Sequence, residues 1–459
     1  MDETVLSGTP VALGAEELRI DPSSPKSRRV RYADITHIGR SSRGLSIATS
    51  RQAILIRRDH FADENSVDSL WQALHGRIGA LPGGDRVLAR MVEIDRLQAR
   101  PRPRVATYVF SALCLVAYFL QSSDRFVTSV GTFAPSLVVA GEYWRLASAN
   151  FLHNMLLFPF HIGLNLFCVV IFGFFTERAL GSLRTVVVMG ISGITAMLAA
   201  GAMGYSQVVG ASGVAAGLAG ALVSIELGGG LGLPVWWRIP RRVLLLAVGL
   251  QVGLDILVPF VAGAAHLGGF LAGYLSARIM LDDALRMRAP GRLARGIAFA
   301  TVGLLIWTIV EVAPLVRRDP VALEHHGLRL LHVRDSTGFR DNEMAWLMLT
   351  ESELTERGAE VALALAERAA DFTAWSNPDI LDTLAEALFT VGDPSGAIHV
   401  IDRAIAITGG TEYFIEQRRR FTGERDADDR PEPPSVPWRP ELPPGGEPLL
   451  IPDSEAIRI

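Results

Sequence analysis

The feature that most constrains this sequence is a series of seven apolar stretches between about residues 105 and 316. Each is roughly 17 to 25 residues long, enough for a helix to cross a bilayer. The stretches are Val105–Gln121, Leu156–Phe175, Thr185–Tyr205, Val209–Leu227, Val243–Phe260, Val261–Leu281 and Gly296–Val316. Pro259 and Gly263 mark the break between the fifth and the sixth. The pattern predicts an all-α polytopic membrane protein with seven transmembrane helices and water-soluble ends.

Composition supports a membrane core and excludes other classes. Charged residues make up 20% of the 459 residues, against about 25% in ordinary globular chains. A net charge of −4 gives no sign of nucleic-acid binding. The two cysteines, Cys114 and Cys168, lie inside apolar stretches, which excludes a disulfide framework. Residues 1–13 lack the apolar segment of a signal peptide, so we expect the first span to direct insertion.

Arginine in the short loops predicts the orientation of the spans, because positive residues favour the cytoplasmic side. Clusters precede the first span and follow the second, fourth and sixth, at Arg96, Arg100, Arg102, Arg104, Arg178, Arg184, Arg238, Arg241, Arg242, Arg286, Arg288, Arg292 and Arg295. Arg317 and Arg318, after the last span, weakly oppose the pattern. We therefore expect a multi-pass protein of the cell membrane with a cytoplasmic N-terminus and an external C-terminus.

Residues 1–82 are predicted to form a cytoplasmic α+β domain. Short β-rich runs are followed by an amphipathic helix with Val67, Leu70, Trp71, Leu74 and Ile78 on one face. Strands closed by one helix resemble a pleckstrin-homology-like (PH-like) barrel. Such a domain could bind lipid or a peptide, or have no ligand, because fold does not imply function. A basic linker over residues 83–104 leads to the membrane core.

The region after the last span is predicted to be helical and repetitive. An offset of 35 residues aligns Leu349 with Leu384 and Ala362 with Ala397, which resembles tetratricopeptide (TPR) repeats. We predict a TPR-like domain over residues 319–421, with a third helix at Glu412–Phe421. Its groove could take a partner peptide, or the helices could form a packing module or a dimer surface. Residues 422–459 are rich in proline and charge and predict a disordered tail.

Three spans carry polar groups that are expensive to bury in lipid, at about 2 to 3 kcal/mol each. These are His161 with Asn165 in the second span, Ser212 in the fourth and His266 in the sixth. Counted from inner ends at Phe175, Leu227 and Met280, the residues His161, Ser212 and His266 lie 14, 15 and 14 residues along their spans. At about 1.5 Å per residue, all three lie roughly 21 to 23 Å above the inner boundary. One shared level predicts one site.

A hydroxyl and an imidazole at one level suit acyl transfer. Serine needs a neighbouring base to take its proton, and neutral His266 is the available one. No acid is obviously placed to orient that ring, so we expect a Ser-His dyad. The Ser212 N–H at a helix start, with the side chains of His161 and Asn165, would stabilise the oxyanion. Gly210 and Gly213 would let the backbone approach a substrate.

Each of these groups also has a structural interpretation. Glycines around a serine in a membrane helix more often serve helix packing than catalysis. His266 could form a bond between helices, and His161 and Asn165 could bond to each other. The agreement in order and depth nevertheless favours a functional site.

These residues resemble the rhomboid family of intramembrane serine proteases, over about residues 104–281. The motifs that carry the resemblance are Gly141-Glu142-Tyr143-Trp144-Arg145 with Phe151-Leu152-His153, His161-x-x-x-Asn165, Gly173-x-x-x-Glu177 with Gly181, Gly210-x-Ser212-Gly213, and Ala265-His266-x-x-Gly269-x-x-x-Gly273. The resemblance implies a six-helix catalytic core over residues 105–281. A cytoplasmic loop and a seventh helix over residues 282–318 would place the chain in the six-plus-one subclass.

The resemblance also implies roles for individual residues. Ser212 would be the nucleophile, His266 the base, and His161, Asn165 and the Ser212 N–H the oxyanion donors, with Gly210, Gly213 and Gly269 as backbone and packing positions. Family members cut transmembrane helices of other proteins near the outer surface, and helix-weak segments suit such cleavage. The fifth span, with Gln251, Gly253 and Asp255, resembles the family's lateral gate.

Two departures from the family pattern affect the site. His161 lies eight positions after His153, where five are usual, which leaves the role of His153 open. Ala216 stands where many relatives have an aromatic residue against the catalytic histidine. An enzyme whose catalytic histidine is held less firmly could turn over its substrate more slowly or select other substrates.

The sequence thus favours a serine endopeptidase without metal or organic cofactor. Its expected partners are single-pass transmembrane substrates, membrane lipid and a candidate peptide of the TPR-like domain, with no nucleic acid. The alternative is a non-proteolytic membrane-protein binder on the same scaffold, which would need neither Ser212 nor His266. A transporter would show polar groups at the midplane or repeated halves, and neither is evident.

Overall fold

The computed structural model describes residues 4–50, 52–157, 159–228, 233–333, 338–433 and 457–458. The chain forms two compact units, each built from several segments. The first comprises Met1–Leu113, Gly163–Ala196 and Ala211–Thr301. The second comprises Cys114–Ile162, Met197–Gly210 and Val302–Ile459.

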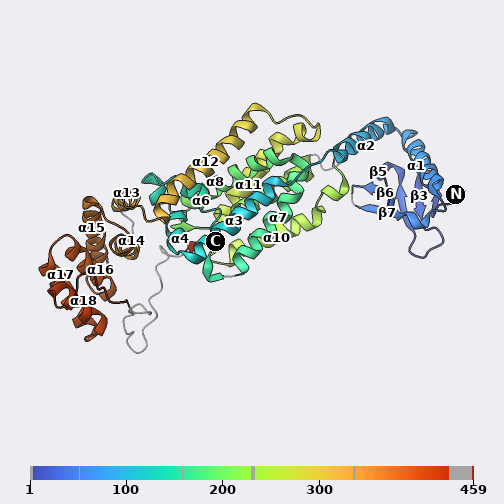
Figure 1. The fold of residues 1–459 in the computed structure, drawn as a ribbon. Helices are drawn as coiled ribbons and strands as arrows, with labels where there is room; N and C mark the ends of the chain where they lie inside the picture. The colour runs from blue at the N-terminus through green and yellow to red at the C-terminus, as the bar shows by residue number, and fades with distance from the viewer. Residues whose placement is uncertain are drawn as a thin grey trace. The chain divides into compact units, whose positions relative to one another are not determined.

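The first unit begins with two antiparallel sheets and a helix. One sheet has the order β1-β2-β3-β4 and the other β5-β6-β7. The bounds are Thr4–Val5, Val11–Leu13, Glu17–Ile20, Arg28–Arg31, Ile35–Ser41, Gly44–Thr49 and Ala53–Arg57 for β1 to β7, and Glu64–Gly79 for α1. The Asp63 carboxylate caps α1 by accepting the Ser66 N–H at 2.7 Å. The predicted strands and helix are confirmed (Figure 1), whereas the PH-like assignment stays a prediction.

The segment predicted as a basic linker contains a helix, α2 (Gly84–Ala99). Met91, Ile94 and Leu97 are buried on one of its faces. Asp95 of α2 contacts the buried ring of His37 on β5, with 2.8 Å between Oδ1 and Nε2. Most of the linker is therefore ordered and packs on the N-terminal sheets.

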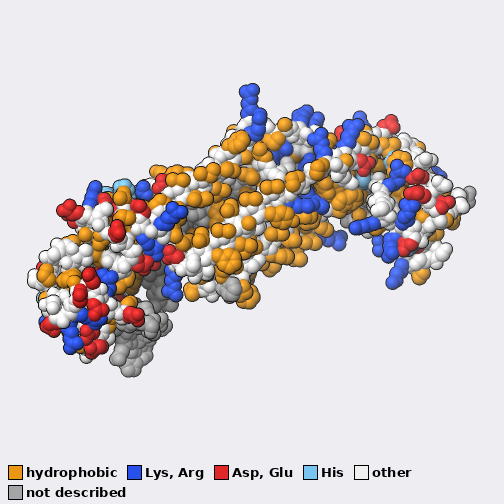
Figure 2. All heavy atoms as spheres, in the orientation of Figure 1, with side chains coloured by type: hydrophobic (Ala, Val, Ile, Leu, Met, Phe, Trp, Pro, Cys, Tyr) orange, Lys and Arg blue, Asp and Glu red, His pale blue; other side chains and the backbone are white. Residues whose placement is uncertain are grey.

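A helix lies over each of the seven predicted apolar stretches. The bounds are Val105–Ser123 for α3, Phe160–Leu180 for α7, Ser182–Ala202 for α8, Ser212–Gly228 for α9, Arg241–Leu257 for α10, Gly263–Leu285 for α11 and Arg292–Val316 for α12. Within the described ranges, four of them, α3, α7, α8 and α12, are long and apolar enough to cross a membrane by length and composition. Apolar side chains dominate their visible faces (Figure 2). The number of seven spans stays a prediction.

Glu177 near the end of α7 caps the start of α3. Its carboxylate accepts the backbone N–H groups of Ala106 at 2.9 Å and Thr107 at 3.0 Å. The Thr107 hydroxyl donates to the same carboxylate at 2.7 Å. A Cβ at Gly173 would collide with the Thr107 side chain. The Gly173-x-x-x-Glu177 motif thus fixes two helices to each other at one end.

The loop between α3 and α7 carries three short helices and belongs to the second unit. They are Phe126–Gly131 (α4), Pro135–Val139 (α5) and Arg145–Ser148 (α6). Trp144, before α6, donates its indole N–H to the Val130 carbonyl at 3.0 Å. The loop contributes to one apolar core with the C-terminal helices, through Leu137, Trp144, Leu323 and Leu330 among others.

The C-terminal part of the second unit is a series of helices. The bounds are Pro320–Leu331 for α13, Gly338–Glu351 for α14, Glu356–Phe372 for α15, Pro378–Thr390 for α16, Pro394–Thr408 for α17 and Glu412–Thr422 for α18. The predicted helix at Glu412 is α18. Gly392, at φ +86°, precedes Asp393, whose carboxylate caps α17 by accepting the Gly396 N–H at 2.9 Å. TPR-like packing stays a prediction, and most of the predicted disordered tail lies outside the described residues. The remaining strands, Gln207–Val208 (β8) and Ile457–Arg458 (β9), pair in parallel.

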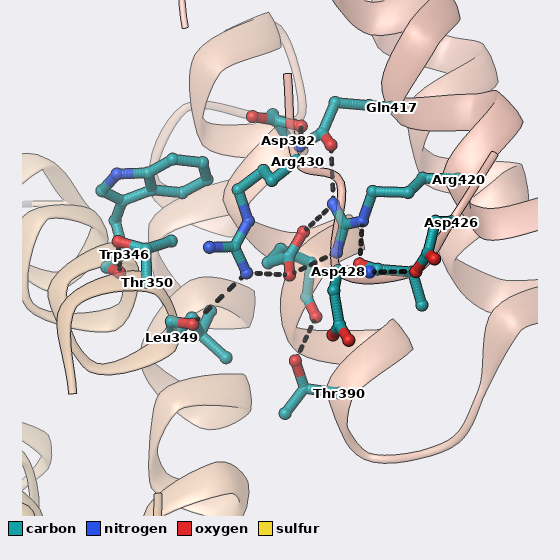
Figure 3. A network of polar contacts seen from close by, with 12 residues as sticks. Trp346, Leu349, Thr350, Asp382, Thr390, Gln417, Arg420, Asp426, Asp428 and Arg430 are labelled. Atoms are coloured by element: carbon teal, nitrogen blue, oxygen red, sulfur yellow. Dashed lines mark hydrogen bonds and ion pairs between the residues drawn. The ribbon is translucent and has the colours of Figure 1, made fainter. Parts of the chain in front are cut away.

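A network of buried charged side chains links helices α16 and α18. Arg420 donates to both Glu386 oxygens, at 2.8 and 2.9 Å. Arg430 reaches the same carboxylate at 2.7 Å, so two guanidinium groups converge on one acid (Figure 3). Glu386 and Arg420 are each 2% exposed. Burial raises the pKa of Glu386, but the hydrogen bonds and charges of the two arginines outweigh it and lower that pKa.

Glu386→Gln is expected to destabilise the C-terminal helices by about 3 to 5 kcal/mol, because it leaves Arg420 buried without a full negative partner. The measurement is protease resistance of this region in the full chain during heating. Asp402→Asn is the matched control, since its partner Arg418 and Asp402 are 39% and 50% exposed, and a change below about 1 kcal/mol is expected there. Equal behaviour of the two variants would refute this role for Glu386.

Candidate active site

Helices α9 and α11 pack closely against each other beside the candidate residues. A Cβ at Gly269 would collide with the Gly213 carbonyl, and one at Gly273 would collide with the Gly217 carbonyl. Both contacts advance by four residues on each helix, so the helices run in parallel and in register. Glycine at these positions lets the two backbones touch. Larger residues would separate the helices.

This pairing brings the same ends of the two helices together. Ser212 is the first residue of α9, and His266 lies in the first turn of α11. The contact between Gly213 and Gly269 lies within one turn of both. The serine and the histidine therefore both lie at the N-terminal ends of two packed parallel helices. The first backbone N–H groups of a helix have no hydrogen-bond partner within the helix, and they form the positive end of the helix dipole.

The ring of His266 is held by Asp255 of α10, and Gln251 of the same helix lies beside this contact. Its Nδ1 lies 2.7 Å from Oδ1 of Asp255 and 3.0 Å from Nε2 of Gln251. The Gln251 amide also donates to Oδ1 of Asp255 at 2.8 Å. The side chains of His266 and Asp255 are 6% and 17% exposed. The expectation that no acid reaches this imidazole is wrong, because α10 carries one to its edge.

The contact with Asp255 decides which ring nitrogen carries the proton. An ionised carboxylate only accepts hydrogen bonds, so Nδ1 of His266 must donate, and a neutral ring then has its lone pair on Nε2. Nε2 is buried and has no hydrogen-bond partner within the described part of the chain. The structure thus brings Ser212 and His266 to one end of the helix pair without a hydrogen bond between them. Hydrogen bonds of this kind are often long before substrate binds.

His161 lies in the first turn of α7, and Asn165 is one turn further along the same helix. The Asn154 backbone N–H donates to Nδ1 of His161 at 2.9 Å. A neutral His161 therefore carries its proton on Nε2, the form that can donate to an oxyanion. Asn165 is 6% exposed.

His153, whose role the sequence leaves open, packs against His161. The two ring centroids are 5.2 Å apart in an edge-to-face arrangement. His153 is fully buried, and burial lowers its pKa to about 4, opposed by its hydrogen bond to the Phe151 carbonyl. His153 is therefore neutral at physiological pH and supports the ring of His161.

Gly210, Gly213 and Gly269, the three glycines predicted from the sequence, have different structural roles. Gly210 has φ +132°, a conformation that side chains strain, and its N–H donates to the Ala149 carbonyl at 2.9 Å. A Cβ at Gly213 would collide with Ala196 of α8. Gly269 makes the contact with α9 described above. All three positions exclude a side chain for a local geometric reason.

Sequence reasoning missed the role of Asp255 and Gln251, although a signal was present. The two residues are four apart in the apolar part of α10 that follows Arg242, so they share one face. An ionisable residue within a membrane helix is by default a functional candidate with a partner. The partner could not be named without the rotation of α10 against α11.

Comparison with known proteins identifies the domain in which these residues lie. The family model "Rhomboid domain" matches residues 140–283. This range includes Ser212, His266 and Asp255, together with His161 and Asn165 of α7. This chain contains a rhomboid domain. Rhomboid proteins are typically intramembrane serine proteases. The domain and the apolar helices make this a multi-pass membrane protein.

Several curated proteins are similar to the chain. "RHOMBOID-like protein 6, mitochondrial" of Arabidopsis thaliana is 34% identical over 36% of this chain and 52% of its own length. "Rhomboid protease GluP" of Bacillus subtilis is 24% identical over 65% of this chain and 54% of its own length. "RHOMBOID-like protein 5" of Arabidopsis thaliana is 31% identical over 33% of this chain and 48% of its own length. The matches thus span about half the length of these relatives.

Proposed function

We propose that this rhomboid protein is a serine endopeptidase that cleaves transmembrane segments of other membrane proteins near the outer face of the membrane. Ser212 would be the nucleophile and His266 the general base. The observation that carries the proposal is the parallel pairing of α9 and α11, with these two residues at its N-terminal end. The lone pair expected on Nε2 of His266 supplies the basic atom that serine needs.

The reaction follows from these two groups. Oγ of Ser212 attacks the scissile carbonyl carbon while Nε2 of His266 takes the hydroxyl proton. The tetrahedral intermediate then collapses, the C–N bond breaks, and the departing amine takes that proton from Nε2. A water molecule, deprotonated by Nε2 in turn, hydrolyses the acyl ester and restores Ser212. Protons and charges balance without a metal or an organic cofactor.

The oxyanion of the intermediate needs hydrogen-bond donors, and the family pattern supplies candidates. We assign this role to the side chains of His161 and Asn165 and to the Ser212 N–H. The hydrogen bond from Asn154 supports His161 as a donor, because it leaves the ring proton on Nε2. The Ser212 N–H lies at the positive end of α9.

The substrate class follows from the surroundings of the reacting groups. Helices α9 and α11 are apolar, so a peptide that reaches Ser212 comes from a membrane-embedded segment. Such a segment must give up helical hydrogen bonds before attack, which favours helix-weak sequences. The arginine pattern supports a cytoplasmic N-terminus and an external C-terminus. The cut would then fall near the outer surface.

The rival function is a binder that holds transmembrane partners without cutting them. Such a protein has no need for a base with a lone pair beside a serine. Retention of Ser212 and His266, and the acid behind the histidine, favour the protease.

Covalent labelling tests the proposal. Full-length protein in detergent is treated with a serine-directed fluorophosphonate or isocoumarin probe, and the bound label is quantified on a gel. We expect wild type to be labelled and Ser212→Ala and His266→Ala to remain unlabelled, because one lacks the nucleophile and the other its base. Labelling that persists in Ser212→Ala would disprove the nucleophile assignment. Absence of labelling and of cleavage in wild type would favour the binder.

A further inference from the structure

We propose that Asp255 is a positioning residue for His266, so that the dyad acts as a triad whose acid comes from the neighbouring helix α10. This inference rests on the proposed function and deepens it. The contact between Oδ1 of Asp255 and Nδ1 of His266 at 2.7 Å carries it. Asp255 would touch neither substrate nor reacting atoms and would act only through the imidazole.

The chemical argument concerns both states of the ring. Before reaction, the carboxylate holds the Nδ1–H form and leaves Nε2 free to accept the Ser212 proton. After proton transfer, the ring is a cation, and the adjacent carboxylate stabilises it in a poorly solvated environment. An amide at position 255 could donate to Nδ1 instead, which would place the proton on Nε2 and block the base.

Gln251 completes the arrangement. Its amide donates to the same Oδ1 at 2.8 Å and so holds the carboxylate against the ring. Both residues lie on one face of α10, one turn apart. Gly263, at the start of α11, is also close, since a Cβ there would lie 3.1 Å from the Asp255 Cβ. The absence of a side chain at residue 263 gives the carboxylate its room.

The packing of α10 gives this contact a further consequence. Leu244 is the only buried residue of α10 among the described residues. Leu246, Leu250, Ile256 and Leu257 are 64 to 78% exposed. These side chains are on the face that lipid would cover, and the Asp255–His266 bond ties the C-terminal end of α10 to α11.

The test compares substitutions that separate chemistry from packing. Asp255→Asn keeps the shape and loses the charge, whereas Asp255→Glu keeps the acceptor-only carboxylate and changes the length. If Asp255 positions His266, we expect Asn to lower kcat about 10- to 10⁴-fold with KM nearly unchanged, and Glu to retain more activity than Asn. Asp282→Asn makes the same chemical change on α11 at an exposed position, 65% exposed, and should match wild type.

A second pair of variants covers the case in which Asp255→Asn does not fold. Gly263→Ala crowds Asp255, whereas Gly249→Ala on α10 meets nothing within 4 Å. We expect only the first to lower kcat. Wild-type kcat in Asp255→Asn, an Asn variant better than Glu, or equal kcat in the two alanine variants would overturn the role of Asp255. Failure of the proposed function looks different, because wild type itself would then neither cleave a transmembrane substrate nor take up the probe.

Discussion

The Ser212→Ala and His266→Ala variants are each expected to lose on the order of 10⁵- to 10⁶-fold in kcat, and the double variant is expected to lose no more than either. The two groups perform one step, since Oγ is a poor nucleophile until Nε2 removes its proton. Loss of either partner therefore forfeits the whole contribution of the pair. The measurement is cleavage of a single-pass transmembrane substrate in liposomes, with product quantified over days so that residual activity is measurable.

Ser224→Ala is the matched control for Ser212→Ala. Ser224 lies on the same helix, α9, and is fully buried, and its hydroxyl has no hydrogen-bond partner among the described residues. The substitution removes the same atom from the same helix without touching the site, so wild-type activity is expected. Losses that multiply in the double variant would show that Ser212 and His266 act independently and would contradict the shared step.

Much of the membrane core could be predicted because its signals are local. Apolar stretches of sufficient length predicted a helix over each of seven segments, and Pro259 with Gly263 predicted the break between α10 and α11. Glycine spacing around Ser212 and His266 follows from the contact of two backbones, which only residues without side chains allow. These features depend on residues within one helix or at one helix crossing.

The acid behind His266 could not be predicted because it depends on the rotation of one helix against another. Asp255 precedes His266 by 11 residues, and a non-helical segment between α10 and α11 separates them. Spacing shows that Gln251 and Asp255 share a face, but not which neighbour that face meets. The helix α2 was missed for a related reason. Its charged residues suggested a linker, while its buried face, with Met91 and Ile94, needs the sheets as a partner.

Pairs of charged residues far apart in the sequence of the second unit could not be predicted from the sequence either. Glu142 lies in the loop after α3, and its partner His326 lies 184 residues later, on α13. The sequence assigned Glu142 to a family motif and His326 to a repeat domain. The structure shows that the two regions share an apolar core and an ion pair.

Glu142→Gln is expected to destabilise the second unit by about 3 to 5 kcal/mol, because it removes the charge from a fully buried cluster. Glu142 is 0% exposed and accepts from Nε of Arg145 at 2.6 Å. Nδ1 of His326 bonds to its other oxygen. Arg145 is 1% exposed and also donates to the carbonyls of Ser129 and Thr132. Glutamine would leave this guanidinium buried without a counter-ion.

The same cluster predicts how the effect varies with pH. Burial would raise the pKa of Glu142, but the charges and hydrogen bonds of His326 and Arg145 outweigh it and lower that pKa to about 2. A lowered pKa in the folded state stabilises the fold above the ordinary value of about 4.5, and this contribution is lost as pH falls from about 4.5 toward 2. The difference between wild type and Glu142→Gln should therefore be full at pH 7 and shrink over that acidic range.

The measurement is the thermal unfolding midpoint in detergent, with protease resistance of the chain between α12 and α13 as a second readout. Glu351→Gln is the matched control, because Glu351 also pairs with an arginine, Arg318, in the same unit but is 51% exposed. Its expected effect is below about 1 kcal/mol. If Glu142→Gln unfolds at the temperature of Glu351→Gln, or if its deficit is the same at pH 7 and pH 3, the buried cluster does not hold the loop to the C-terminal helices.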